Sequence, residues 1–225
     1  MITSIEQNTT TPQRQSSSNT QGLYPSTDLV ILAGGQARRM NGINKLLQRF
    51  DAQIQLLKIY QQLQQQVAQV WVNSHRDHSY YRQLIANIRC FVDDQAGFIG
   101  PLMGMKSAWT HSQADYILFV PCDVTYIPEQ VLSQLHQCLI AVPTAQLAYL
   151  SINQSALYPF CLAKRSSLPM LIKHLQQPNA AQRSLKACFQ ALHAVALEIE
   201  NPALIFHSIN GIDELQQYQS LQSIR

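Results

Sequence analysis

One segment of the chain carries small and cationic residues in an order suited to phosphate chemistry. Leu32-Ala33-Gly34-Gly35 is followed by Arg39 and Lys45. Small residues let backbone N–H groups approach phosphate oxygens, a guanidinium can bind two oxygens at once, and Lys45 adds a compact charge near a leaving group. Taken alone, a strand that ends in Gly-Gly is equally typical of an ordinary tight turn. The spacing to Arg39 and Lys45 favours a phosphate site, and it matches neither a P-loop nor a dinucleotide-binding fingerprint.

A second segment, Val120-Pro121-Cys122-Asp123, places a carboxylate directly after an apolar run. If the run is a buried strand, Asp123 emerges at its carboxyl end, where it can hold Mg²⁺, an ion that prefers one or two carboxylates plus phosphate oxygens. The alternative of equal weight is an Asp that caps a helix or fixes a loop. A third segment runs from Asp93 to Gly100-Pro101-Leu102, and its glycines leave room for a planar or phosphorylated ligand. By itself it is better interpreted as a solvated turn.

The segments that must position these residues alternate between strand and helix. Leu29 to Ala33 is a short, continuously apolar run, as expected of a buried parallel strand. The other expected strands of the first half are 70–72, 90–92 and 116–120, and its expected helices are 54–63, 80–86, 103–109 and 128–140, the last started by Pro128. For the second half we expect strands at 147–151, 158–162 and 195–199, and helices at 168–175, 185–192 and from Asp213.

Four strand-then-helix units in series predict an α/β fold with a Rossmann-like, mostly parallel sheet and helices on both faces. Ligands of such folds bind outside the carboxyl ends of the strands. The residues that follow Ala33, Val72, Val92 and Val120 should therefore face one crevice.

Composition limits the organisation and the class of partner. The chain has 225 residues, of which 46% are hydrophobic, enough for one domain of ordinary size. Residues 1–27 are dominated by Ser, Thr, Gln and Asn and are expected to form a disordered tail, so that the domain spans 28–225. A net charge of +3 is too small for a dedicated nucleic-acid binder. We also expect no membrane span, no export signal and therefore a cytoplasmic protein, present as a monomer or weak oligomer.

The cysteines and histidines indicate no metal centre of their own. Five cysteines without a C-x-x-C spacing argue against a disulfide framework and a zinc site. The seven histidines lack a spacing such as H-E-x-x-H and are expected to be structural or solvated.

Taken together, the segments resemble the molybdenum cofactor guanylyltransferase family (MobA), within the wider group of nucleoside-triphosphate transferases with a Rossmann-like fold. The resemblance runs from about Leu29 to Leu215. It rests on L-A-G-G-x-x-x-R-M-G-G-x-D-K in the first loop, a strand that ends in Asn (Asn73), an Asp before G-P-L (Asp93 and Gly100-Pro101-Leu102), P-C-D after the fourth strand (Asp123), and a closing N-x-N-T-p-x-D/E-L segment partly matched by Ser208 to Leu215.

The resemblance implies a nucleotide-diphospho-sugar-transferase-like fold and a nucleotidyltransferase activity. GMP would pass from GTP to molybdenum-bound molybdopterin, with Mg²⁺ as cofactor, to give molybdopterin guanine dinucleotide and pyrophosphate. The implied catalytic residues are Arg39, Lys45 and Asp123, with Asp123 on the metal. The implied binding residues are Leu32, Ala33, Gly34, Gly35, Lys45, Asn73, Asp93, Gly100, Pro101, Leu102, Asp123 and Asn210. Contacts with pterin-handling and molybdoenzyme partners are implied as well.

Four positions depart from the family pattern. Asn41 and Asn44 replace a Gly and an Asp of the first loop, and Ser208 and Gly211 replace an Asn and the Thr of the closing segment. Asn41 tolerates a positive φ, whereas Asn44 keeps an acceptor without a charge. These departures leave two alternatives open: a nucleotidyltransferase that uses CTP or another phosphate acceptor, and a catalytically weak GTP-binding protein that escorts the cofactor.

Overall fold

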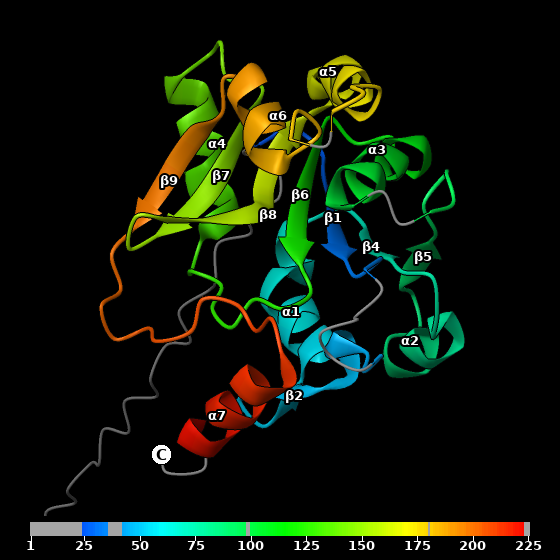
Figure 1. Ribbon diagram of the computed structural model, residues 1–225, viewed down its shortest axis with the longest axis vertical. Helices are drawn as coiled ribbons and strands as arrows, with labels where there is room; N and C mark the ends of the chain where they lie inside the picture. The colour runs from blue at the N-terminus through cyan, green and yellow to red at the C-terminus, as the bar shows by residue number, and fades with distance from the viewer. Residues whose placement is uncertain (1–23, 36–41, 98–99, 180, 223–225) are drawn as a thin grey trace, which may run out of the picture.

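A seven-stranded sheet forms the centre of the protein (Figure 1). The computed structural model describes residues 24–35, 42–97, 100–179 and 181–222. In spatial order the strands are β5 (Arg89–Phe91), β4 (Val70–Asn73), β1 (Thr27–Leu32), β6 (Tyr116–Pro121), β8 (Ser155–Lys164), β7 (Leu147–Ile152) and β9 (Val195–Ile199). Only β8 runs antiparallel to its neighbours, β6 and β7, whereas every other pairing in this sheet is parallel. The predicted mostly parallel sheet is therefore confirmed.

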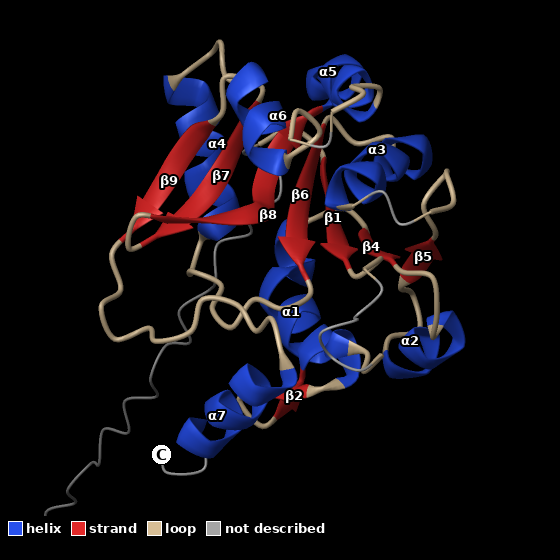
Figure 2. Cartoon of the chain, viewed as in Figure 1, coloured by secondary structure: helices blue, strands red, loops and turns tan. Residues whose placement is uncertain are grey.

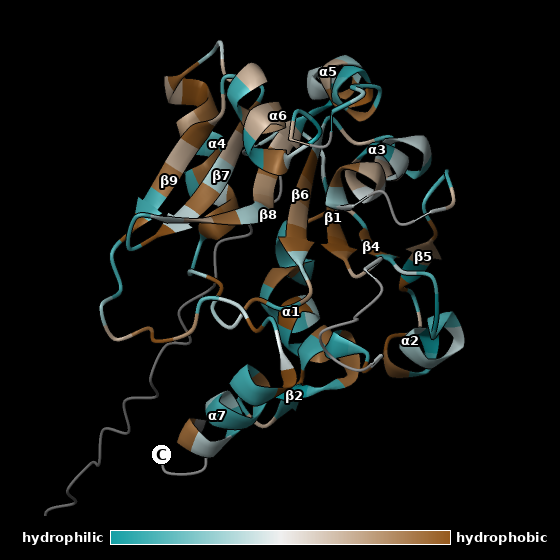
Figure 3. Ribbon diagram, viewed as in Figure 1, coloured by the Kyte–Doolittle hydropathy of each residue, from teal (hydrophilic) through white to brown (hydrophobic). Residues whose placement is uncertain are grey.

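The central strand β1 shows how the sequence specifies a sheet that is covered on both faces. All six of its residues are buried. Because successive side chains of a strand point to opposite faces, Leu29 and Ile31 join one core cluster, while Val30 and Leu32 join another. The hydrophobic colouring of β1 and of most of β6 in Figure 3 reflects this two-sided burial.

Helices cover both faces of the sheet, as predicted (Figure 2). On the face of Leu29 and Ile31 the core includes residues of α1 (Gln55–Leu63), α2 (His78–Leu84) and α4 (Val131–Ala141). On the opposite face it includes residues of α3 (Pro101–His111), α5 (Leu168–Leu175) and α6 (Leu185–Ala191). Within the described residues, no helix is both long and apolar enough to cross a bilayer.

Short elements complete the fold. They are the 3₁₀ helices η2 (Lys45–Leu47), η3 (Gln64–Gln66) and η4 (Arg165–Ser167) and the two-stranded sheet of β2 (Arg49–Phe50) and β3 (Gln53–Ile54). The closing helix α7 (Ile212–Gln222) packs on this small sheet, because Phe50, Leu215 and Tyr218 share a third core cluster. The small sheet was not predicted, since two-residue strands carry no periodic signal.

The predicted start of the helix at 128–140 is wrong. Pro128 does not start a helix. Helix α4 begins at Val131, because Gln130 takes a left-handed backbone conformation (φ 55°) that prevents the helix from extending back to Pro128. Most of the predicted tail lies outside the described residues. Its last residues, however, belong to the fold, since β1 begins at Thr27 and the ring of Tyr24 stacks on His136 with the centroids 4.6 Å apart.

Candidate active site

The carboxyl ends of β4, β1 and β6 lie side by side and are joined by backbone hydrogen bonds beyond the strands. The N–H of Ala33 donates to the carbonyl of Asn73 (2.9 Å), and the N–H of Cys122 donates to the carbonyl of Leu32 (3.1 Å). Leu32 and Ala33, at the end of β1, are thereby joined to Asn73 on one side and to the Asp123 segment on the other. This arrangement places the predicted motifs at one edge of the sheet.

A cavity of about 240 Å³ opens at this edge. Six of the predicted site residues line it: Leu32, Ala33, Gly35, Lys45, Pro101 and Asp123. Its other lining residues were not predicted: Ile43, Asn44, Arg76, Pro121, Cys122, Tyr158 and Pro159. We call this hollow the Lys45 cavity.

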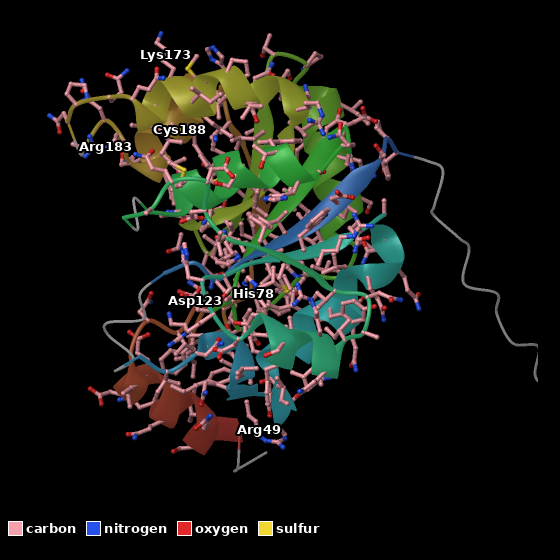
Figure 4. All side chains as sticks on the ribbon, turned by 90° about the vertical axis from the view of Figure 1, so that its right-hand side faces the viewer. Arg49, His78, Asp123, Lys173, Arg183 and Cys188 are labelled. Atoms are coloured by element: carbon pink, nitrogen blue, oxygen red, sulfur yellow. The ribbon has the colours of Figure 1, made fainter. Side chains whose placement is uncertain are left out.

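Lys45 and Asp123 meet inside the Lys45 cavity. The Nζ atom of Lys45 lies 2.8 Å from Oδ2 of Asp123 and donates a second hydrogen bond to the carbonyl of Ile209 (2.7 Å). Both side chains are mostly buried but keep 15% and 20% of their surface exposed, so that a ligand can reach them. Figure 4 shows Asp123 in the middle of the molecule, above α7. Asn44 starts the turn that presents Lys45, because its side chain caps η2 by accepting from the N–H of Leu46.

Asn73 and Asp93 form a second polar group behind the loop. Nδ2 of Asn73 donates to Oδ1 of Asp93 (2.9 Å), and the other carboxylate oxygen lies 3.3 Å from Nε2 of His75. A Cβ atom at Gly34 would come within 2.7 Å of Oδ1 of Asn73, so only glycine fits there without displacing the amide. Asn73 therefore lies against Gly34, and neither Asn73 nor Asp93 lines the Lys45 cavity.

The other predicted site residues within the described part of the chain, Gly100, Leu102 and Asn210, do not line this cavity. Gly100 has a φ of 103°, which favours glycine, and it precedes Pro101 at the start of α3. Leu102 packs in the core beneath α3, so its side chain faces away from solvent. Asn210 follows Ile209, whose carbonyl binds Lys45, and Arg39 lies outside the described residues.

A neighbouring cavity of about 270 Å³ shares Pro121, Asp123 and Tyr158 with the first. It continues along the start of β8 and the segment before α7, where Ser155, His207, Ser208 and Asn210 line it. Nε2 of His207 is buried, and among the described residues it has no hydrogen-bond partner. We call this hollow the His207 cavity. Asp123 thus lies where two hollows join.

Comparison with known proteins identifies the family. Residues 29–195 match the family described as "MobA-like NTP transferase domain". The chain belongs to this family. It is 59% identical over 202 residues to a protein named molybdenum cofactor guanylyltransferase from Acinetobacter baumannii, a match that covers 90% of this chain and 95% of the relative. It is 38% identical over 187 residues to a protein of the same name from Pasteurella multocida, with 83% and 96% covered.

Solved structures of the MobA-like fold confirm the architecture. Molybdopterin-guanine dinucleotide biosynthesis protein A from Archaeoglobus fulgidus superposes with a TM-score of 0.65 at 16% identity, over 88% of this chain and 100% of that one. A CMP:2-keto-3-deoxy-manno-octonic acid synthetase complexed with CTP gives 0.61 at 14% identity, over 88% and 98%. The predicted family, fold and enzyme class, a nucleotidyltransferase, are confirmed.

Within this MobA-like site, Asn44 does more than stand in for an acidic residue. Its Nδ2 donates to Oδ2 of Asp77 (2.6 Å) and to the hydroxyl of Tyr81 (2.7 Å), both from the region of α2. Asn44 therefore ties the turn that carries Lys45 to a separate helix. A carboxylate at this position would face the carboxylate of Asp77.

Cys122 is not built as a nucleophile. Burial, together with the negative charge of Asp123, raises the pKa of its thiol to about 12. The thiol therefore stays protonated near neutral pH. Among the described residues, no group of three or more His, Cys, Asp or Glu side chains is arranged to hold a metal ion.

Gly104, Tyr158 and His207 are among the supporting residues that were not predicted. Gly104 faces Asn73 from α3, because a Cβ atom there would lie 2.5 Å from Oδ1 of Asn73. Tyr158 borders both cavities although it lies in β8, beyond the motifs. His207 precedes the partly matched closing segment by one residue. A glycine inside an apolar helix was the one available signal, since it indicates a close approach.

Proposed function

We propose that this chain transfers GMP from GTP to the terminal phosphate of molybdenum-bound molybdopterin, releasing pyrophosphate. The observation that carries the proposal is the position of Asp123, paired with Lys45 at the junction of two adjoining cavities. Two phosphate-bearing substrates must meet at one phosphorus atom, and a junction of this kind accommodates both. The names of the relatives, molybdenum cofactor guanylyltransferase, support the same substrates.

The chemistry of Asp123 fits Mg²⁺. The ion is usually held by one or two carboxylates together with phosphate oxygens and water, which suits a single, partly exposed carboxylate at a strand end. When bound, Mg²⁺ would neutralise negative charge on the phosphate oxygens. Lys45 would hold Asp123 in place until the nucleotide arrives and would then contribute its charge to the triphosphate.

In the proposed reaction, an oxygen of the acceptor phosphate attacks the α-phosphorus of GTP. A new P–O bond forms, the bond from the α-phosphorus to the bridging oxygen breaks, and pyrophosphate leaves with the electron pair. A phosphate monoester is already ionised near neutral pH, so no side chain is needed to remove a proton. The small residues after β1 bring backbone N–H groups to the phosphates, while Arg39 and Lys45 supply positive charge.

The acceptor would occupy the second cavity. Hydroxyl and amide groups of Ser155, Ser208 and Asn210 line it, together with the imidazole of His207. These are hydrogen-bonding groups suited to a phosphate and to the polar edge of a pterin. As part of the same proposal, pterin-handling and molybdoenzyme partner proteins deliver this acceptor and collect the product.

The proposal is tested by incubating the purified protein with GTP, Mg²⁺ and molybdenum-bound molybdopterin. Pyrophosphate should be released in step with the guanine dinucleotide. CTP in place of GTP should support less than about a tenth of this rate. Equal or faster release with CTP would favour the alternative of a different nucleotide, which the CTP-bound structural neighbour makes worth testing. Tight GTP binding without any product would favour the alternative of an escort protein.

A further inference from the structure

We propose that Gln55 is a positioning residue that fixes the orientation of Asp123. The inference rests on the proposed function, because it takes Asp123 as the metal-binding carboxylate. Gln55 is the first residue of α1 and is completely buried. Its Nε2 atom donates to the carbonyl of Val124 (2.7 Å) and to the carbonyl of Cys122 (3.2 Å). One side chain therefore holds the residue before Asp123 and the residue after it.

The carbonyl of Asp123 itself is held by a different segment. It accepts from the N–H of Ile209 (2.9 Å), while the N–H of Cys122 donates to Leu32. The backbone from Cys122 to Val124 thus has hydrogen-bond partners in three other segments: Gln55, Ile209 and Leu32. With its backbone fixed in this way, Asp123 has little freedom except at its own side chain, which reaches Lys45.

Glutamine suits this role chemically. Its amide carries two N–H donors, one for each carbonyl, whereas an aliphatic side chain of similar size would leave both carbonyls without this partner. Burying an amide is costly, and Oε1 of Gln55 has no hydrogen-bond partner among the described residues. The two hydrogen bonds that the amide donates offset the free-energy cost of burying its unpaired oxygen.

Three residues further along α1, Lys58 makes a related contact. Its Nζ donates to the carbonyl of Thr125 (2.5 Å) and pairs with Asp51. The first two turns of α1 thereby hold the carbonyls of Cys122, Val124 and Thr125. Of the two side chains, Gln55 is the one whose hydrogen bonds hold the residues on both sides of Asp123.

A matched control exists at the other end of the same strand. Arg165 grips the loop before β6, donating to the carbonyls of Ala114 (2.7 Å) and Ser112 (2.8 Å). The variant Arg165→Met removes a side chain that holds two loop carbonyls, as Gln55→Met does, but at the end of β6 away from Asp123. Comparing the two variants separates positioning of Asp123 from a general loss of stability.

The experiment measures GTP affinity by calorimetry with saturating Mg²⁺ and with EDTA, and then kcat and the KM for Mg²⁺. In the natural protein we expect Mg²⁺ to strengthen GTP binding at least about tenfold. Gln55→Met should reduce this gain to less than about threefold and raise the KM for Mg²⁺, while GTP affinity in EDTA stays within about twofold. Arg165→Met should keep the full gain even if its melting temperature falls as far.

An unchanged gain in Gln55→Met, or an equal loss of it in Arg165→Met, would overturn the inference. If Gln55→Met does not fold, Gln55→Asn replaces it, since the shorter amide cannot reach both carbonyls, and an unchanged gain would again overturn the inference. Wild-type protein that binds Mg²⁺ and GTP but makes no product would refute the proposed function alone. Wild-type protein whose GTP affinity is unaffected by Mg²⁺ would refute the inference.

Discussion

The ammonium group of Lys45 lies 2.8 Å from the carboxylate of Asp123, although 78 positions separate the two residues in the sequence. The same ammonium group binds the carbonyl of Ile209. Lys45 therefore joins three segments: the first loop, the end of β6 and the segment before α7. In the proposed reaction, the phosphate oxygens of the nucleotide would compete with Asp123 and with the carbonyl of Ile209 for this ammonium group.

Removing the positive charge of Lys45 should strongly reduce turnover. We expect Lys45→Met to lower kcat/KM for GTP by about 100-fold or more, because charge developing on the phosphoryl oxygens loses a preorganised cation. Lys106→Met serves as the control, since Lys106, on α3, forms an ion pair of similar length with Asp94 (2.6 Å). That variant should keep its activity within about twofold. A loss below tenfold in Lys45→Met would place Lys45 outside the reaction.

Restoring the family's acidic residue beside Lys45 should harm this protein. Asn44→Asp would set two carboxylates against each other, because Nδ2 of Asn44 lies 2.6 Å from Oδ2 of Asp77. We expect a loss of about 1 to 2 kcal/mol of unfolding free energy near pH 7, measured by chemical denaturation. Exchanging the two groups in Asn44→Asp/Asp77→Asn should recover most of it. Equal stability of the single and double variants would contradict this explanation.

Several site positions were predictable because they follow strands in the chain. Leu32, Ala33, Gly35 and Asp123 had only to be assigned to strand ends, since parallel strands bring those ends to one edge. Lys45 was placed by its spacing from the glycines. The confirmed two-sided burial of β1 follows from a continuous apolar run, which needs no knowledge of distant contacts.

Other positions depend on contacts that a single sequence does not reveal. Gln55 looks like one more polar residue in a Gln-rich helix, yet it is buried against the loop after β6. The left-handed conformation of Gln130, which delays α4, is rare for glutamine and has no local signal. Leu102 was predicted as a binding residue from a motif, but a leucine in the first turn of a covered helix packs inward.

The close approach of α3 to Asn73 can be tested with Gly104→Ala. The added Cβ would lie 2.5 Å from Oδ1 of Asn73 and 3.1 Å from Leu32, so the amide must move and its bond to Asp93 must lengthen. We expect a net loss of about 1 to 3 kcal/mol, despite the better helix propensity of alanine. Gly211→Ala is the control, because nothing lies within 4 Å of the new atom. Equal melting temperatures of the two variants would contradict the predicted clash.

If the acceptor binds in the His207 cavity, as proposed, a substitution there should change the KM for the acceptor and not the KM for GTP. His207→Leu should raise the KM for the pterin acceptor by about tenfold and leave the KM for GTP within twofold, because His207 lines the second cavity and not the first, and its Nε2 has no hydrogen-bond partner among the described residues. Initial-rate kinetics with each substrate varied in turn measure both constants. His174→Leu on α5 controls for removal of an imidazole. A rise in the KM for GTP instead would assign His207 to the nucleotide.

Acid should weaken the fold through His136. Burial lowers the pKa of its imidazole to about 4, whereas an unfolded histidine titrates near pH 6.5. Below pH 6.5 the unfolded chain therefore binds the extra proton more readily, and stability falls as the pH drops from 6.5 to 4, by about 3 kcal/mol. Below pH 4 both states are protonated and this contribution levels off.

The variant His136→Phe isolates this effect. It keeps an aromatic ring between Tyr24 and Tyr116 but cannot titrate, although it loses the contact with Thr27 (3.2 Å). Urea denaturation at several pH values should show a flatter dependence between pH 4 and 6.5 than in the natural protein. Parallel curves for the two proteins would exclude His136 as the cause.

The antiparallel direction of β8 decides which of its residues lie near Asp123. Because it runs against its neighbours, its first residues rather than its last reach the reactive edge, carried there by the hairpin that joins it to β7. Gly35 and Lys45, by contrast, follow β1 in the other half of the sheet. In the proposed reaction, a change in the hairpin between β7 and β8 would therefore alter the acceptor side and leave the groups proposed for the triphosphate in place.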